Sequence, residues 1–168
     1  MIEVYVTGLA FDTMTSSPVV LLKKRQGERV LPIWIGVNEA SVIAMELSGV
    51  TYKRPLTHDL LKAVLTGFSA DVQKVVVSSL EDNTFYAKLY IVAPGNSLFE
   101  IDARPSDSIA MALKMKSQIF VSSDLDDSFV ELTIESPEDS TDGDSIDTLD
   151  LGSRLRNIRP EDFGHFNL

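Results

Sequence analysis

Two arginines, Arg54 and Arg104, each precede a proline, a hydroxyl residue and an apolar run whose spacing predicts a helix. Proline disfavours the helical conformation in the residue before it, so Thr57 and Ser106 are expected N-caps that accept bonds from the first free amides. The remaining amides, the helix dipole and a guanidinium together form an anion site. We therefore predict that these four side chains bind phosphate. The alternative is a pair of ordinary capped helix starts.

The first of these sites contains a histidine and an aspartate that could transfer protons. His58 is the only histidine in residues 1–122, and Asp59 follows it directly. A histidine side chain titrates near a pH of about 6.5, so it suits general acid–base catalysis, and an adjacent carboxylate can orient its ring. We predict catalytic roles for His58 and Asp59. The alternative is a histidine that only caps or packs at the start of a helix.

The second site carries carboxylates on both sides of Arg104. Asp102 is expected on the same strand face as Arg104, and Asp107 in the first turn of the helix that follows. Carboxylate oxygens are ligands that Mg²⁺ and Mn²⁺ prefer, and substrate phosphate can complete the shell. We predict that Asp102 and Asp107 act in catalysis and hold such an ion, with Glu39 completing the set. Salt bridges with Arg104 or Arg54 are the structural alternative.

The sequence that must position these residues divides into two similar halves. Residues 35–47 match residues 101–113, and the strand-like runs before them also align, which predicts an internal duplication of a strand–strand–strand–helix unit. The expected strands cover residues 2–11, 18–24, 30–35, 72–80, 84–92, 98–103 and 118–122. The expected helices follow caps at Asn38, Thr57 and Ser106. Antiparallel hairpins covered by helices favour an α+β fold with a mixed or antiparallel sheet.

The charge of the chain is divided between a neutral body and an acidic tail. Residues 1–121 hold 12 acidic and 12 basic side chains, whereas residues 122–168 hold 13 acidic and 3 basic ones, so the net charge of −10 lies in the tail. We predict one domain over residues 1–122, a largely disordered acidic linker over 123–150, and a short docking segment over 151–168, where apolar residues return.

The composition excludes or disfavours several classes of site and location. The chain has no cysteine, which excludes disulfides and thiolate metal sites. Its glycines form no GxGxxG or P-loop pattern, so we expect no organic cofactor. The first residues read as a strand rather than a leader, and no apolar run approaches the roughly 18–20 residues that span a membrane. We therefore expect a soluble cytoplasmic protein that makes no membrane contact.

Four segments together resemble a known family. They are LPIWIGVNEASVIAMELSGV, RPLTHDLL, NTFYAKL and IDARPSDSIAMALKMKSQIFVS, in this order. Through them, residues 1–122 resemble the bifunctional nuclease (BFN) family of bacteria and plants. The resemblance implies an α+β fold, frequently a homodimer, and degradation of both DNA and RNA. It assigns no catalytic residue, so the roles above depend on the residues themselves.

The candidate residues, together with the resemblance, which implies activity on both DNA and RNA, predict a nuclease of low sequence specificity that hydrolyses phosphodiester bonds. The expected partners are nonspecific DNA and RNA and a second copy of the chain. The acidic tail is a candidate for docking on the protein itself or on a protein partner. Because the body has no basic stripe, nucleic-acid binding should be salt-sensitive. The alternative is a noncatalytic dimeric module that binds phosphorylated ligands or acidic partners through the two anion sites.

Overall fold

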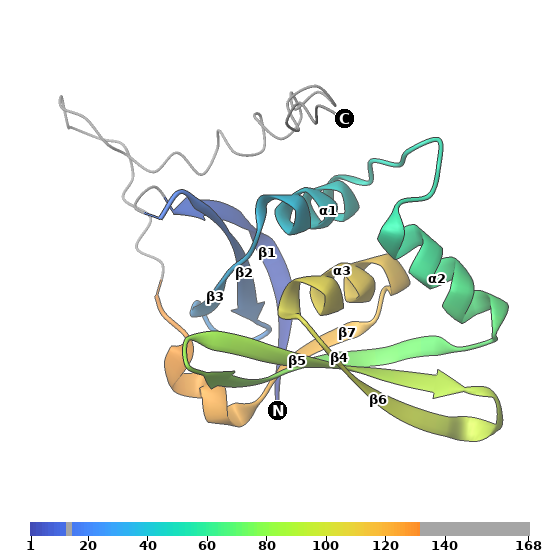
Figure 1. Ribbon diagram of the computed structural model, residues 1–168. Helices are drawn as coiled ribbons and strands as arrows, with labels where there is room; N and C mark the ends of the chain where they lie inside the picture. Colours follow the sequence, from blue (N-terminus) through green and yellow to red (C-terminus); the bar gives the residue numbers. More distant parts are fainter. Residues whose placement is uncertain (13–14, 132–168) are drawn as a thin grey trace.

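The computed structural model describes residues 1–12 and 15–131, which form one seven-stranded sheet with helices packed on it (Figure 1). The strands are β1 (Ile2–Asp12), β2 (Ser17–Lys24), β3 (Val30–Trp34), β4 (Asp71–Glu81), β5 (Thr84–Ala93), β6 (Ser97–Ala103) and β7 (Gln118–Val121). The helices are α1 (Val37–Ser48), α2 (Thr57–Gly67) and α3 (Pro105–Met115), with short 3-10 helices η1 (Pro94–Asn96) and η2 (Ser123–Ser128). The predicted α+β class is confirmed. No helix in these residues is long and apolar enough to cross a bilayer.

The strands follow the order β3-β2-β1-β7-β4-β5-β6, with β7 at the centre of the sheet. β1, β2 and β3 form one antiparallel meander, and β4, β5 and β6 form another. β7 pairs antiparallel with β1 and parallel with β4, so it joins the two meanders. Each meander is followed by a helix, α1 or α3, and α2 connects the two halves. The origin of this arrangement in an internal duplication stays a prediction.

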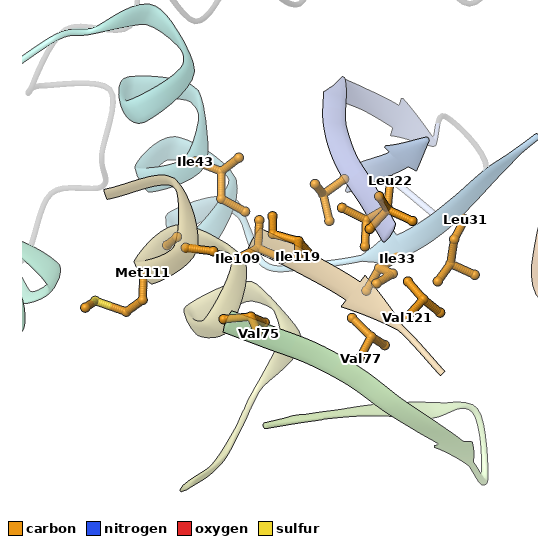
Figure 2. Packing of buried hydrophobic residues seen from close by; sticks show 14 of the residues in the cluster. Leu22, Leu31, Ile33, Ile43, Val75, Val77, Ile109, Met111, Ile119 and Val121 are labelled. Carbon is orange, nitrogen blue, oxygen red and sulfur yellow. The ribbon is translucent and has the colours of Figure 1, made fainter. Parts of the chain in front are cut away.

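Apolar side chains between the sheet and the helices form the core. Figure 2 shows Ile43 of α1 and Ile109 of α3 close to Ile119 of β7, with Val75 of β4 nearby. All four are buried, and full burial of such a side chain contributes about 1.5–3 kcal/mol. Seven of the eleven residues of α3 are buried, which makes α3 the fixed element against which α1 and α2 are placed.

The first two helices begin earlier than the sequence predicts. α1 has Gly36 as its N-cap, so Asn38 lies inside the helix. α2 has Leu56 as its N-cap, and Thr57 is its first residue. Neither N-cap residue accepts a hydrogen bond through its side chain. The predicted caps at Asn38 and Thr57 are therefore wrong, because the backbone enters the helix before these side chains can reach back to its free amides.

The third helix also begins before its predicted cap. Arg104 is the N-cap of α3, and Pro105 occupies the first helical position, where its missing N–H costs no bond. Ser106 lies inside the helix and is only 6% exposed. The predicted cap at Ser106 is wrong, because proline stabilises the first turn rather than standing outside it.

The packed structure continues past β7. Leu125 of η2 and Phe129 lie in the core, 6% and 4% exposed. Asp126 forms ion pairs with Lys24 at 2.5 Å and with Arg29 at 3.1 Å, which hold η2 against the first meander. Residues 123–131, which the sequence assigns to the acidic linker, thus pack against the body. The rest of the predicted linker and the predicted docking segment, residues 132–168, lie outside the described residues.

One side of α2 carries apolar side chains that the described residues cover only in part. The helix buries no residue completely, and only Leu65 among its leucines packs against the core. Leu60, Val64 and Phe68 recur at four-residue spacing and are 58%, 45% and 75% exposed. The apolar spacing correctly predicts this helix, but most of its apolar residues face outward.

Candidate functional site

The first turns of α2 and α3 meet at a histidine–aspartate pair. His58 Nε2 lies 3.2 Å from Asp107 Oδ1. Arg104 donates to the same carboxylate twice, from Nε to Oδ2 at 2.7 Å and from Nη2 to Oδ1 at 3.2 Å. Its Nη1 lies 2.8 Å from Oε1 of Glu39, in the first turn of α1. These four residues form the first polar row, which links all three helices.

A second polar row crosses the same helices further along. Lys114 of α3 forms ion pairs with Glu46 of α1 and with Asp59 of α2, the latter at 2.5 Å. The other oxygen of Asp59 accepts the backbone N–H of Leu56 at 2.8 Å, which stabilises the start of α2. The Lys114 side chain is only 10% exposed. This row therefore ties the beginning of α2 to the two helices beside it.

The spacing along the helices explains why the two rows are parallel. Glu39 and Glu46 are seven residues apart, and so are Asp107 and Lys114. Seven residues are close to two helical turns, so each pair lies on one face of its helix. α2 supplies two consecutive residues at its start, His58 to the first row and Asp59 to the second. Changes in the position of α2 should therefore affect both rows together.

The start of α1 has the shape needed to bring Glu39 to Arg104. Gly36 is the N-cap, with extended backbone angles that any residue can adopt. A Cβ atom at this position would collide with Oε2 of Glu39. The glycine thus matters for space rather than for backbone freedom, because it lets the Glu39 side chain fold back over the end of the helix.

The charges around Asp107 determine which nitrogen of His58 is basic. Partial burial acts to raise the pKa of Asp107, but the Arg104 guanidinium and the His58 ring outweigh it and hold that pKa below its ordinary value. Asp107 is therefore ionised at neutral pH and can only accept hydrogen bonds. It follows that Nε2 of His58 carries the shared hydrogen, so that in the neutral form of the ring the lone pair is on Nδ1.

The second row is also held in its charged form. The Lys114 ammonium, together with the Leu56 N–H, lowers the pKa of Asp59. Burial acts to lower the pKa of Lys114, but bonds to Asp59 and Glu46 outweigh it and raise that pKa above its ordinary value. The row therefore keeps two carboxylates and one ammonium at neutral pH, with a net charge of one negative unit.

A pocket of about 240 Å³ opens beside the histidine. His58, Asp59 and Lys114 lie on its polar side, Val42 and Met45 of α1 are among its apolar residues, and the loop before α2 borders it. A hollow of about 340 Å³ lies at the start of β4 and the η1 turn, but no residue of either polar row lines it. The smaller pocket is therefore the candidate substrate site.

Asp102 does not join the polar rows. It lies opposite Lys88 in the pairing of β6 with β5. Leu89, the next residue of β5, is buried in the core on the side of the sheet that faces the helices. Because side chains alternate along a strand, Asp102 lies on the other side, away from α3. The strand ends at Ala103, so the alternation expected to align Asp102 with Arg104 does not continue that far.

The predicted metal ligands are only partly brought together. Glu39 and Asp107 both contact Arg104, whose guanidinium bridges them. Across residues 1–12 and 15–131, no group of three or more His, Cys, Asp or Glu side chains is placed to hold an ion. Two carboxylates that share a guanidinium do not fit Mg²⁺ or Mn²⁺ as they stand, since these ions need more oxygen ligands. A metal requirement stays a prediction.

The four predicted phosphate ligands have different surroundings. Arg54 and Thr57 are exposed, and Arg54 has no ion-pair partner within the described part of the chain. The Arg104 side chain is 65% exposed despite its two carboxylate partners. Ser106 is buried and offers no surface to a bound phosphate. Three of the four can therefore meet a ligand from solvent.

Sequence reasoning missed three residues of this region. Glu46 and Lys114 complete the second row, and Tyr52 borders the pocket with 55% of its surface exposed. The repeat of a charged residue after seven positions in α1 and α3 was a usable signal for Glu46 and Lys114. Tyr52 is followed by Lys53 and Arg54, and an aromatic residue next to basic ones is a pattern typical of nucleic-acid contacts.

Comparison with known proteins identifies the family. A sequence model described as "Bifunctional nuclease domain" matches residues 20–129. The chain belongs to the bifunctional nuclease family. An uncharacterized protein of Mycobacterium tuberculosis is 36% identical over 163 residues, which cover 96% of this chain and 97% of the relative. Bifunctional nuclease 1 of Arabidopsis thaliana is 29% identical over 135 residues, 79% of this chain and 42% of the plant protein. The first polar row and η2 lie within the matched range of the bifunctional nuclease domain.

Proposed function

We propose that this protein is a nuclease of low sequence specificity that hydrolyses phosphodiester bonds of DNA and RNA. The observation that carries the proposal is the His58–Asp107 pair in a bifunctional nuclease domain: Asp107 is held by the exposed Arg104, and His58 lines a pocket. Phosphodiester hydrolysis needs a group that takes a proton from water and positive charge that stabilises the phosphate. The pair and the arginine supply both.

His58 acts as the general base in this proposal. Its Nε2–H donates to ionised Asp107, so the free lone pair of Nδ1 takes the proton from an attacking water. Asp107 orients the ring and stabilises the imidazolium that forms. Arg104 keeps Asp107 in place through two bonds, and Asp59, whose oxygens already accept from Lys114 and Leu56, positions α2 rather than moving protons.

Phosphate binding falls to the exposed arginines. Arg54 has its full charge available, whereas Arg104 shares its charge with Glu39 and Asp107. Arg54 is therefore the stronger phosphate ligand, and Thr57, three residues further along, is exposed at the start of α2. Few cations contribute, so binding should be weak, and each phosphate contact should add only about one unit to the slope of log affinity against log salt concentration.

The proposal is tested by cleavage of labelled single-stranded and duplex DNA and RNA, with Mg²⁺, Mn²⁺ or a chelator. We expect loss of cleavage in His58→Ala and in Asp107→Asn, because each removes one half of the pair. Asp102→Asn is the matched control, an aspartate exchanged on the opposite side of the sheet, and should cleave like the wild type. Equal cleavage by all variants would overturn the assignment, and binding without cleavage would favour a noncatalytic module.

We also propose that the protein works as a homodimer joined through α2 and β6. The exposed stripe of Leu60, Val64 and Phe68 lies on α2, and β6 is an edge strand whose Phe99 and Ile101 are 50% and 43% exposed. Large exposed apolar patches mark interfaces, and unpaired strand edges pair readily. A second copy would cover both features.

The oligomeric state tests this proposal. We expect light scattering during size-exclusion chromatography to give twice the chain mass for the wild type, and the single mass for Val64→Glu and Phe68→Glu. Leu80→Glu, an exposed leucine at the end of β4, should remain dimeric. A wild type that is monomeric at tens of micromolar concentration, or stripe variants that still dimerise, would refute the interface.

A further inference from the structure

We propose that the pocket beside His58 binds one unpaired nucleobase that carries an exocyclic amino group, and that Glu46 and Tyr52 recognise it. This inference rests on the proposed nuclease function and names what the substrate must present next to the cut phosphate. Adenine, guanine and cytosine carry such a group, whereas uracil and thymine do not.

The size and lining of the pocket suit a single ring system. Its volume is about 240 Å³, below the roughly 300–1,000 Å³ of pockets that take drug-sized ligands. Val42, Met45 and Val50 give it an apolar side on which a flat ring can lie. A base paired within a duplex cannot enter, so the strand must be single or locally opened, as for other enzymes that take a base out of the stack.

The polar side favours a neutral donor over an anion. The second row brings two carboxylates and one ammonium to the pocket, and Lys53, which also lines it, balances the remaining negative charge; the pocket therefore has no net positive charge to hold a phosphate group. Both oxygens of Asp59 already accept bonds, from Lys114 and from Leu56. Lys114 bonds to only one oxygen of Glu46, Oε1, and no hydrogen bond to Oε2 is found within the described residues. Glu46 Oε2 is therefore the acceptor for the amino group of the base.

The loop at the mouth supplies the remaining contacts of a single strand. Tyr52 borders the pocket with 55% of its surface exposed, so its ring can stack on the entering base. Lys53, which also lines the pocket, and Arg54 follow it in the chain and provide two positive charges on this loop. Aromatic stacking beside cations that follow the backbone is how proteins bind single strands. The phosphate next to the bound base would then lie near His58.

Binding of nucleosides to the full-length protein tests the pocket without requiring cleavage. We would titrate adenosine, uridine and ribose 5-phosphate by calorimetry in the presence of a chelator. Adenosine should bind about tenfold more tightly than uridine, because only adenosine donates a hydrogen bond from an exocyclic amino group to the charged Glu46 carboxylate. Ribose 5-phosphate, which has no base, should not compete with adenosine.

Variants separate recognition from folding. Glu46→Gln should remove the preference for adenosine, and Tyr52→Ala should weaken both nucleosides about tenfold through lost stacking. Val50→Trp fills the pocket without touching the polar rows and should abolish binding. Tyr86→Ala, another exposed tyrosine placed on β5, is the control and should bind like the wild type. Thermal melts of each variant report whether it folds.

The two proposals fail in different ways. Equal binding of adenosine and uridine to the wild type, or a preference that survives in Glu46→Gln, refutes the nucleobase pocket even if the protein cleaves nucleic acid. Selective adenosine binding by a protein that cleaves no DNA or RNA refutes the nuclease assignment and leaves the pocket in place.

Discussion

Replacing Lys114 by methionine tests the structural role of the second polar row. Lys114 is 10% exposed and lies between Glu46 and Asp59, which are 21% and 39% exposed. Removing one partner of a fully buried ion pair costs about 3–5 kcal/mol, because the other charge is left without compensation. Solvent reaches both carboxylates here and screens part of that cost. We therefore expect Lys114→Met to lower the free energy of unfolding by about 2 kcal/mol.

Urea denaturation followed by circular dichroism measures this change, and thermal melts should show a midpoint lowered by about 4–8 °C. Lys88→Met is the matched control, since Lys88 pairs with Glu100 at the same 2.5 Å but both side chains are 40% or more exposed. The control should melt within error of the wild type. Adding Asp59→Asn to Lys114→Met should recover part of the loss. If Lys114→Met is no less stable than the control, the second row does not hold the helices together.

Three further outcomes follow from the described contacts and charges. The pKa of Asp107 is lowered in the folded protein, so ionised Asp107 stabilises the fold above about pH 4, and this contribution is lost as pH falls through the folded pKa. In urea titrations at several pH values, Asp107→Asn should therefore lose less stability than the wild type as the pH falls below about 4. Ser108 Oγ is buried without a partner in the described residues, so Ser108→Ala should stabilise by about 1 kcal/mol, whereas Ser117→Ala removes a 2.6 Å bond to a backbone carbonyl and should destabilise by a similar amount. Deleting residues 136–168 removes acidic charge and should raise affinity for single-stranded DNA in anisotropy titrations; unchanged affinity would argue against docking of the tail.

The strands and helices could be predicted because their signals are local. Alternation, turn residues and the apolar spacing of α3 place each element within one or two residues of its observed ends. The caps at Asn38, Thr57 and Ser106 were predicted wrongly from equally local rules. In α3 the proline itself occupies the first helical turn, and in α1 glycine gives Glu39 room to fold back.

The site could be predicted only where its residues are close in sequence. Arg104 and Asp107 pair within one turn of α3, as their spacing suggests. The link from His58 to Asp107 spans 49 positions, and the link from Glu46 to Lys114 spans 68 positions, so both depend on how three helices pack. Asp102 was misplaced because the strand ends one residue before Arg104, which turns the two side chains to different sides of the sheet.

The outward-facing stripe of α2 shows a related limit. A pattern of apolar residues predicts which face of a helix avoids water, but it does not say whether the body of the same chain covers that face. In α2 the side toward α3 is instead held by His58 and Asp59, which are polar. The proposed homodimer would reconcile the apolar spacing with the exposure of Leu60, Val64 and Phe68.

Chemical rescue of His58→Ala tests the central claim most directly. If Nδ1 of His58 takes the proton from the attacking water, its loss should slow cleavage of single-stranded RNA and DNA at least about 100-fold. Added imidazole should restore part of the rate in His58→Ala and leave the wild type and His165→Ala, the exchange of the chain's other histidine, unchanged. A His58→Ala protein that cleaves at the wild-type rate, or one that folds and is inactive but gains nothing from imidazole, would contradict the account.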